Sequence, residues 1–138
     1  MKTAEIRLKS HGLRITESRR SIVEIFCSHE HALSYSDILD DLDEGFDRVT
    51  LYRTIKTFEE NGLIHVIPDT EGDPKYALCS SNCSSEQHND SHMHFKCKVC
   101  NITWCIEDQE VPRVNLPDGF NLETVNLIVE GRCKKCSA

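Results

Sequence analysis

The sequence predicts an α+β protein. Its N-terminal half is a winged helix-turn-helix, and its C-terminal half is a small domain stabilised by a bound metal ion. Two observations lead to this prediction. Residues 1 to about 67 contain one cysteine, Cys27, and show the apolar spacing of helices. Residues from about 79 to 138 contain the other seven cysteines and have the pattern of short strands and loops. We therefore expect two domains, residues 1–78 and 79–138.

Composition narrows the class of protein. The chain has 138 residues, of which 38% are hydrophobic, so two domains of this size each need a staple or a partner for stability. No apolar run is long enough to span a membrane, and the first residues do not begin a signal peptide, so we expect a cytoplasmic protein in which disulfides are rare. Eight cysteines then indicate metal binding. The net charge of −7 neither shows nor excludes DNA binding, because a basic patch can occupy one face.

Three residues of the first half have the character of helix N-caps. Thr16 precedes one apolar stripe, Ser34 is followed three residues later by Asp37 in a short version of the capping box, and Asp47 precedes the third helix. We expect the third helix to end at Gly62, because glycine easily adopts the left-handed conformation there. The apolar residues at helical spacing are Ile22, Val23, Ile25 and Phe26, then Ile38, Leu39 and Leu42, then Leu51, Ile55 and Phe58.

An extended pattern follows the third helix. Residues 63–67 form one predicted strand, residues 69–74 contain Gly72 and Pro74 and form a turn, and residues 76–78 form a returning strand. Three helices followed by a β-hairpin is the order of elements in a winged helix-turn-helix.

The third helix carries a polar face opposite its apolar stripe. An arginine can donate two hydrogen bonds to guanine, and a threonine or tyrosine can contact a thymine methyl or a phosphate. A solvated polar face is the alternative for any single helix. Its place after two helices and before a hairpin is that of a recognition helix, which favours DNA binding. The polar residues are Arg48, Thr50, Tyr52, Arg53 and Lys56.

Two CxxC motifs predict a structural zinc site. Cys97 and Cys100 form one motif, and Cys133 and Cys136 form the other, about thirty residues later. Each motif can present two thiolates to one metal ion, and two motifs complete a tetrahedron. Soft thiolates in a closed site select zinc. A single CxxC could be a redox motif, but two without a thioredoxin-like context favour zinc.

At this point the chain resembles the ferric uptake regulator family. The string RVTLYRT at 48–54, with Phe58 and the sequence GLI at 62–64, resembles the recognition helix of that family, and GLRIT at 12–16 resembles its opening segment. The resemblance extends from about residue 5 to residue 136. It implies that Tyr52 and Arg53 contact bases and backbone, and that Arg14 and Arg19 hold phosphates.

The resemblance also implies an assembly and a partner. The second half would be an α/β dimerisation domain, and the four-cysteine site would be its structural zinc site. A two-fold homodimer would bind a double-stranded DNA operator that is an inverted repeat, rich in A·T pairs. The metal would control repression, and no membrane partner is expected.

A second, sensory metal site follows from the same resemblance. His92 and His94 flank Met93 and would lie on one side of a strand, where the family has sensory ligands. His65 in the first wing strand and Cys79 after the second resemble ligands of the zinc-uptake members. Three imidazoles and one thiolate suit zinc, and iron(II) and manganese(II) are the alternatives.

Some positions depart from the iron- and manganese-sensing members. Those members place a histidine and an acidic residue where this chain has Ala32 and Ala77, and His31 is one position out of register. Cys105 stands where an acidic ligand is found, and it could bind metal or pack within a strand. The residues whose roles stay open are His31, Cys83, His88 and Cys105.

Two other functions compete with a zinc-responsive repressor. One is an iron- or peroxide-responsive regulator with the same fold and a different metal. The other is a hydrolase with an open zinc site, for which only Glu86 and Asp90 are available as a general base near the histidine pair.

Overall fold

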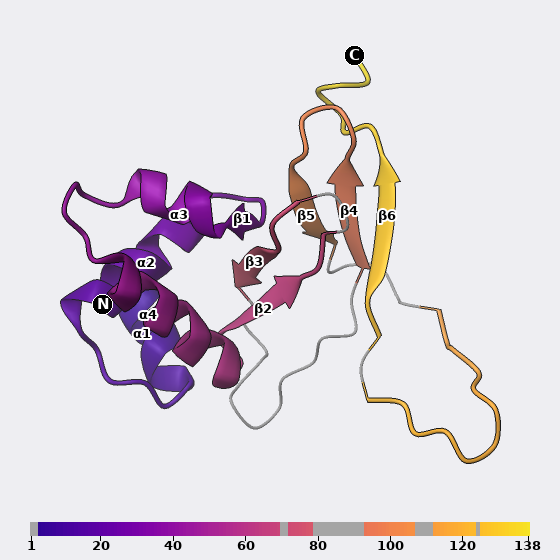
Figure 1. Cartoon of the computed structure of the whole chain (residues 1–138), viewed down its shortest axis with the longest axis horizontal. Helices are drawn as coiled ribbons and strands as arrows, with labels where there is room; N and C mark the ends of the chain where they lie inside the picture. Colours follow the sequence, from indigo (N-terminus) through magenta and orange to yellow (C-terminus); the bar gives the residue numbers. More distant parts are fainter. Residues whose placement is uncertain (1–2, 70–71, 79–92, 107–111, 124) are drawn as a thin grey trace. The chain divides into compact units, whose positions relative to one another are not determined.

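The computed structural model describes residues 3–69, 72–78, 93–106, 112–123 and 125–138. The chain divides into two compact units, Met1–His88 and Asn89–Ala138, and Figure 1 shows the elements of each. The expected boundary between residues 78 and 79 stays a prediction, because residues 79–92 lie outside the described part of the chain. No helix among the described residues has both the length and the apolar character needed to cross a membrane.

The first unit begins with four helices. The second, third and fourth helices are those that the sequence predicts, and the first was not predicted. Their bounds are α1 Thr3–Ser10, α2 Glu17–Ser28, α3 Tyr35–Asp41 and α4 Arg48–Glu60. Gly62 follows α4 with a φ of 74°, as its predicted place after the helix end requires.

The predicted N-caps are confirmed. The Thr16 hydroxyl accepts a hydrogen bond from the backbone N–H of Arg19 at 3.2 Å. Ser34 and Asp37 form a reciprocal capping box, with donor–acceptor distances of 3.1 and 3.0 Å. The carboxylate of Asp47 accepts from the first turn of α4. Each cap satisfies backbone N–H groups that have no partner inside the helix, and this fixes where the helix begins.

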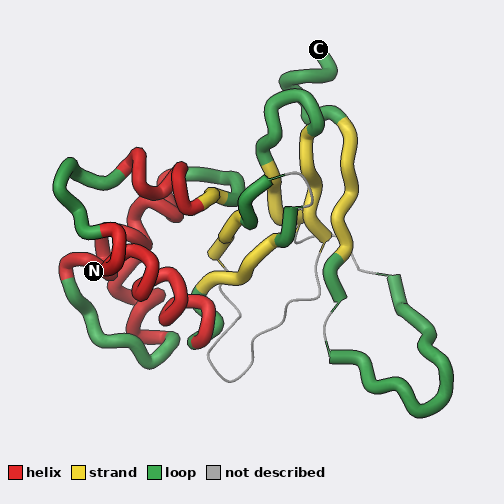
Figure 2. Tube along the Cα trace, viewed as in Figure 1, coloured by secondary structure: helices red, strands yellow, loops and turns green. Residues whose placement is uncertain are grey.

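A three-stranded antiparallel sheet completes the first unit (Figure 2). Its strands are β1 Leu33–Ser34, β2 Ile64–Ile67 and β3 Lys75–Leu78, in the order β1-β3-β2. The predicted hairpin is β2 and β3, whose register pairs His65 with Ala77. The short strand β1 adds a third member that tethers the start of α3 to the wing.

One apolar cluster holds the helices and the wing together. Leu8 of α1, Ile22 of α2 and Ile38 of α3 are fully buried in it. Leu51 and Phe58 from the apolar face of α4 are fully buried as well. The polar face of α4 is thereby turned outward.

The second unit is a mixed three-stranded sheet. Its strands are β4 Met93–Cys97, β5 Thr103–Ile106 and β6 Leu127–Gly131, in the order β5-β4-β6. β4 pairs antiparallel with β5 and parallel with β6. Together with the helical first unit, this sheet confirms the predicted α+β class.

Candidate metal centres and DNA-reading helix

The four cysteines of the two CxxC motifs converge at one end of the second unit. The Sγ atoms of Cys97, Cys100, Cys133 and Cys136 all lie within 4.8 Å of one another. The Sγ atoms of Cys100 and Cys133 are 3.9 Å apart. Metal–sulfur bonds of about 2.3 Å in a tetrahedron separate sulfur atoms by roughly 3.8 Å, so the cluster fits a single tetrahedral ion.

Tight turns shape this cluster. Asn101 follows the first motif with a φ of 62°, and its N–H donates to the carbonyl of Cys97 at 2.9 Å. Asparagine tolerates this left-handed conformation better than most residues. In the second motif the N–H of Ser137 donates to the carbonyl of Cys133 at 2.9 Å. Each turn brings two thiols to the same side.

The backbone around the cluster favours a thiolate. Hydrogen bonds from the backbone N–H of Cys100, and then from those of Cys133 and Val99, lower the pKa of Cys97 to about 6, against a burial effect that raises it. The N–H of Cys133 lies 3.4 Å from the Cys97 sulfur. A thiol hydrogen bond with Cys133 raises the pKa of Cys136 to about 12. One ligand is therefore ready in its metal-binding form, and the cation must displace protons from others.

A second set of metal-binding side chains lies on the sheet of the same unit. His94 on β4 and Cys105 on β5 are direct cross-strand partners. Directly opposed residues have their Cβ atoms about 5 Å apart on one face of the sheet, so an imidazole and a thiol lie side by side. His94 is 1% exposed and Cys105 is partly buried. The pair could offer one nitrogen and one sulfur atom to a metal ion.

Of the other three predicted sensory ligands, His65, Cys79 and His92, the structure describes only His65. His65 is buried on β2, opposite Ala77 on β3. A polar ring at 5% exposure in an otherwise apolar strand is costly unless the ring has a bonding role. Cys79 and His92, together with the open candidates Cys83 and His88, lie outside the described residues.

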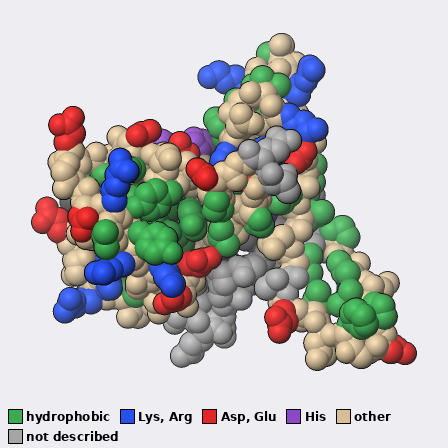
Figure 3. Space-filling view, in the orientation of Figure 1, with side chains coloured by type: hydrophobic (Ala, Val, Ile, Leu, Met, Phe, Trp, Pro, Cys, Tyr) green, Lys and Arg blue, Asp and Glu red, His purple; other side chains and the backbone are tan. Residues whose placement is uncertain are grey.

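The predicted DNA-reading face of α4 is exposed. Tyr52 is 62% exposed, and Arg48, Arg53 and Lys56 are also exposed. Figure 3 shows both Lys and Arg and Asp and Glu side chains on the helical part of the molecule, on the face in view. The hydroxyl of Tyr35 on α3 donates to the carbonyl of Arg48 at 2.7 Å, which ties the start of α4 to the preceding helix.

Two predicted DNA-binding residues also have bonds within the protein. The Arg19 guanidinium donates to the carbonyl of Arg14 at 3.0 Å, so it holds the segment that carries the exposed Arg14 side chain. The Thr50 hydroxyl donates to the carboxylate of Asp47 at 2.9 Å. This bond, followed by the backbone N–H of Val49, lowers the pKa of Asp47 below its ordinary value, which keeps the cap of α4 ionised.

Comparison with known proteins agrees with this architecture. The sequence model of the ferric uptake regulator family matches residues 10–130. The chain belongs to this family. A ferric uptake regulation protein of Staphylococcus aureus is 27% identical over 133 residues, covering 94% of this chain and 92% of that protein. The resemblance drawn from the sequence is thereby confirmed.

Solved structures share the fold of this ferric uptake regulator family member. A zinc uptake regulator in complex with zinc and DNA superimposes with a TM-score of 0.70 at 21% identity, covering 97% of this chain and 90% of that one. The Vibrio cholerae ferric uptake regulator gives a TM-score of 0.61 at 20% identity, covering 94% and 98%.

Family membership fixes the general function. The ferric uptake regulator family consists of metal-responsive transcription regulators rather than enzymes, which speaks against the hydrolase alternative. Repressor activity, DNA binding and metal binding are therefore properties of this chain's family, and the four-cysteine cluster fits the metal-binding part.

Cys105 is one of the residues whose role the sequence left open. It stands at an acidic ligand position of the family, but its neighbours Trp104 and Ile106 also favour a buried strand, so the sequence did not assign it as a ligand. The structure shows that it is within a strand and faces His94. The pairing register of two strands was the missing information, because it depends on contacts distant along the chain.

Proposed function

We propose that this protein is a zinc-responsive repressor that binds an inverted DNA repeat as a homodimer. The observation that carries the proposal is the chemistry of the second ligand set, in which His94 faces a thiol, Cys105, where the iron-sensing pattern would have a carboxylate. Thiolate and imidazole together favour zinc over iron(II) and manganese(II). The ions proposed are zinc in the four-cysteine cluster and zinc at the sensory site.

The sensory ligands proposed from the sequence are His65, Cys79, His92 and His94. The buried state of His65 and His94 supports metal ligation, because a buried imidazole needs a bonding role to offset its lost hydration. The pairing of Cys105 with His94 makes Cys105 a further ligand candidate in this set. These residues come from both halves of the chain, so metal binding would shift the population toward the DNA-competent arrangement.

DNA reading is assigned to the outer face of α4. Arg53 would read a guanine or hold a phosphate, with Tyr52 and Thr50 beside it. Arg14 and Arg19 would hold phosphates from the segment before α2. The proposed operator is an inverted repeat, because a two-fold dimer presents two such helices. Its proposed richness in A·T pairs comes from the resemblance to the family.

The composition of the second unit supports the homodimer. Among its described residues, Cys97 is the one buried hydrophobic side chain. Large apolar side chains of the segment 112–123 are exposed, and Phe120 is 66% exposed. Several large apolar side chains exposed in one segment are typical of an interface, and a second copy of the same unit is the partner that we propose.

An iron- or peroxide-responsive regulator of the same family is the second candidate. The observation that favours it is the 27% identity with the Staphylococcus aureus ferric uptake regulation protein, over nearly the whole chain. It shares the fold and the DNA-reading helix, so only the sensed metal separates the two candidates.

The ligand assignment is tested by single cysteine variants. Cys79→Ser and Cys105→Ser should keep the structural zinc and lose zinc-stimulated binding to an inverted repeat selected from random duplexes, measured by fluorescence anisotropy. Cys27→Ser removes an exposed cysteine of α2 and should respond like the wild type. If both Cys79→Ser and Cys105→Ser respond to zinc like the wild type, the thiolate sensor is wrong.

The reading helix is tested in the same assay. Arg53→Ala should weaken binding by about 1–3 kcal/mol if Arg53 reads a guanine, and by less if it only holds a phosphate. Tyr52→Phe should also weaken binding while the fold stays intact. Wild-type affinity in the double variant would show that α4 does not read the operator.

A further inference from the structure

The segment between α2 and β1 contains a second pair of histidines that the proposed function does not use. His29, Glu30 and His31 follow one another immediately after α2. The imidazole rings of His29 and His31 have their centroids 5.2 Å apart, with the ring planes inclined by 50°. Both residues lie within the first unit, and neither belongs to the ligand sets described above.

The hydrogen bond of His29 fixes which ring nitrogen can bind a metal. Its Nε2 lies 2.8 Å from the carboxylate oxygen Oδ2 of Asp41. An ionised carboxylate only accepts hydrogen bonds, so Nε2 carries the proton. In the neutral ring the lone pair is then on Nδ1.

The hydrogen bond of His31 also determines which of its ring nitrogens can bind a metal, but here the available nitrogen is Nε2. Its Nδ1 lies 3.0 Å from the carbonyl oxygen of Ala32. A carbonyl only accepts, so Nδ1 carries the proton, and in the neutral ring the lone pair is on Nε2.

These two hydrogen bonds are the kind that metal-binding histidines make. A histidine that binds a metal through one nitrogen almost always donates the other N–H to a carboxylate or to a backbone carbonyl. The bond orients the ring and makes the ligating nitrogen more basic. His29 has the carboxylate form of this arrangement, and His31 has the carbonyl form.

The spacing of the two rings is also suitable. A metal–nitrogen bond of about 2.1 Å puts the ring centre roughly 3.2 Å from the metal, so two imidazoles on a tetrahedral ion have centres roughly 5 Å apart. The observed 5.2 Å between the ring centres matches this separation. His29 is half-buried and Asp41 is exposed, so a cation can reach the pair from solvent.

We propose that His29 and His31 form a binding site for a divalent transition-metal cation that prefers imidazole, such as Ni²⁺, Cu²⁺ or Zn²⁺, with water completing the coordination. The site shares no residue with the four-cysteine cluster or with the proposed sensor. Asp41 is a positioning residue that acts through His29.

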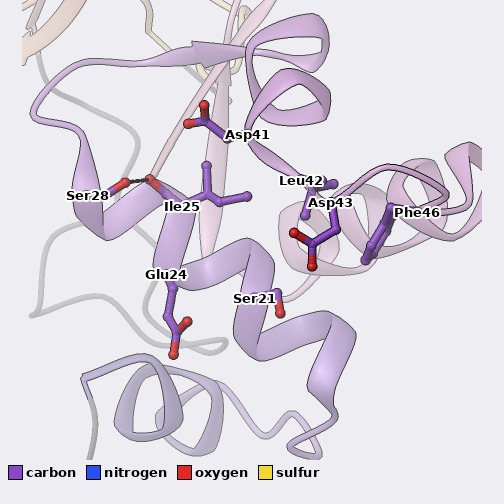
Figure 4. A pocket seen from close by; sticks show the side chains of 8 residues that line it. All are labelled: Ser21, Glu24, Ile25, Ser28, Asp41, Leu42, Asp43 and Phe46. Carbon is purple, nitrogen blue, oxygen red and sulfur yellow. Dashed lines mark hydrogen bonds between the residues drawn. The ribbon is translucent and has the colours of Figure 1, made fainter.

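The surroundings of the site attract cations. Asp41 also lines an open hollow of about 370 Å³ between α2 and the segment after α3. Figure 4 shows the carboxylates of Glu24, Asp41 and Asp43 around this hollow. They raise the local concentration of cations without any specific geometry. The experiment must therefore separate general attraction from binding by the two imidazoles.

The test uses the zinc-loaded full-length protein and Ni²⁺ as the probe. Paramagnetic Ni²⁺ should broaden the backbone amide signals of residues 28–32 and 41 selectively and saturably in a ¹H–¹⁵N spectrum. His31→Gln should weaken this binding at least about tenfold and leave the rest of the spectrum unchanged, which shows that the variant is folded. Asp41→Ala should weaken binding about tenfold by freeing the His29 ring.

Asp43→Asn is the matched control, because it removes a carboxylate from the same hollow without touching the ring positions. Its Ni²⁺ affinity should stay within about twofold of the wild type. The proposal is overturned if Ni²⁺ causes no selective broadening at these residues, if His31→Gln binds like the wild type, or if Asp43→Asn loses as much as Asp41→Ala. The signals belong to this site alone, so the result does not depend on whether the zinc sensor is correct.

Discussion

The two units of this chain are stabilised in different ways. In the first unit, every helix and the wing contribute to one buried apolar cluster, from Ala4 on α1 to Ile64 on β2. In the second unit, the described residues with buried side chains are Cys97, His94, Lys96 and Thr103. The first unit therefore resembles an ordinary small domain, whereas the second has a cysteine of the four-cysteine cluster where a core residue would be.

This difference follows from the amount of apolar surface that each half can bury. A unit of fifty residues, Asn89–Ala138, is near the size below which a hydrophobic core alone does not suffice. A metal ion bound by the four thiolates would supply the missing stabilisation, because its binding free energy would become folding free energy. The comparison implies that metal should matter for the fold of one unit and leave the fold of the other unchanged.

The largest expected effect comes from breaking the cysteine cluster. Cys97→Ser should lose the bound metal and the ordered structure of the second unit, and with it the proposed dimer, while the helices of the first unit stay folded. Elemental analysis, size-exclusion chromatography and circular dichroism on one preparation measure all three.

Cys27→Ser is the matched control for this variant, because Cys27 is an exposed cysteine of α2 outside the cluster. It should keep the metal and the oligomeric state. A Cys97→Ser protein that is dimeric, folded and free of metal would contradict the account of the second unit.

A core substitution in the first unit should have the opposite effects to Cys97→Ser: it should destabilise the first unit and leave the metal content unchanged. Leu51 is fully buried in the first unit, and Leu51→Ala should lower the free energy of unfolding of that unit by about 2–5 kcal/mol. The metal content should stay at the wild-type value. Chemical denaturation followed by far-ultraviolet circular dichroism gives the first quantity. Loss of metal in this variant would mean that the two units depend on one another for stability.

The smallest expected effect comes from removing one helix N-cap in the first unit. Ser34→Ala removes the side-chain half of the capping box of α3 and should cost about 1 kcal/mol. Ser36→Ala changes an exposed serine inside the same helix and should be nearly neutral. Thermal unfolding of the two variants side by side measures the difference, and equal midpoints would show that the cap contributes nothing to stability.

Local signals made much of the first unit predictable. Thr16, Ser34 and Asp47 begin their helices as expected, because a cap needs only residues within three positions of itself. The four-cysteine cluster was predictable for a similar reason, since each CxxC brings two ligands together by its own turn.

The features that sequence analysis missed depend on distant contacts. Helix α1 buries only Ala4 and Leu8, which gives too few apolar residues for a periodic pattern. Strand β1 has two residues and exists because it pairs with β3, about forty residues later. The pairing of His94 with Cys105 likewise depends on the register of β4 and β5.

The most direct test of the central claim is a metal titration of protein that keeps its structural metal and has been stripped of any other. Operator affinity is followed while Zn²⁺, Fe²⁺ and Mn²⁺ are added separately to the same preparation. The account predicts that Zn²⁺ raises the affinity for the inverted repeat at lower free concentration than either of the other ions, because a thiolate ligand favours it. If only Fe²⁺ or Mn²⁺ raises the affinity, the zinc-responsive function is wrong, and the chain belongs with the iron- or peroxide-responsive regulators of its family.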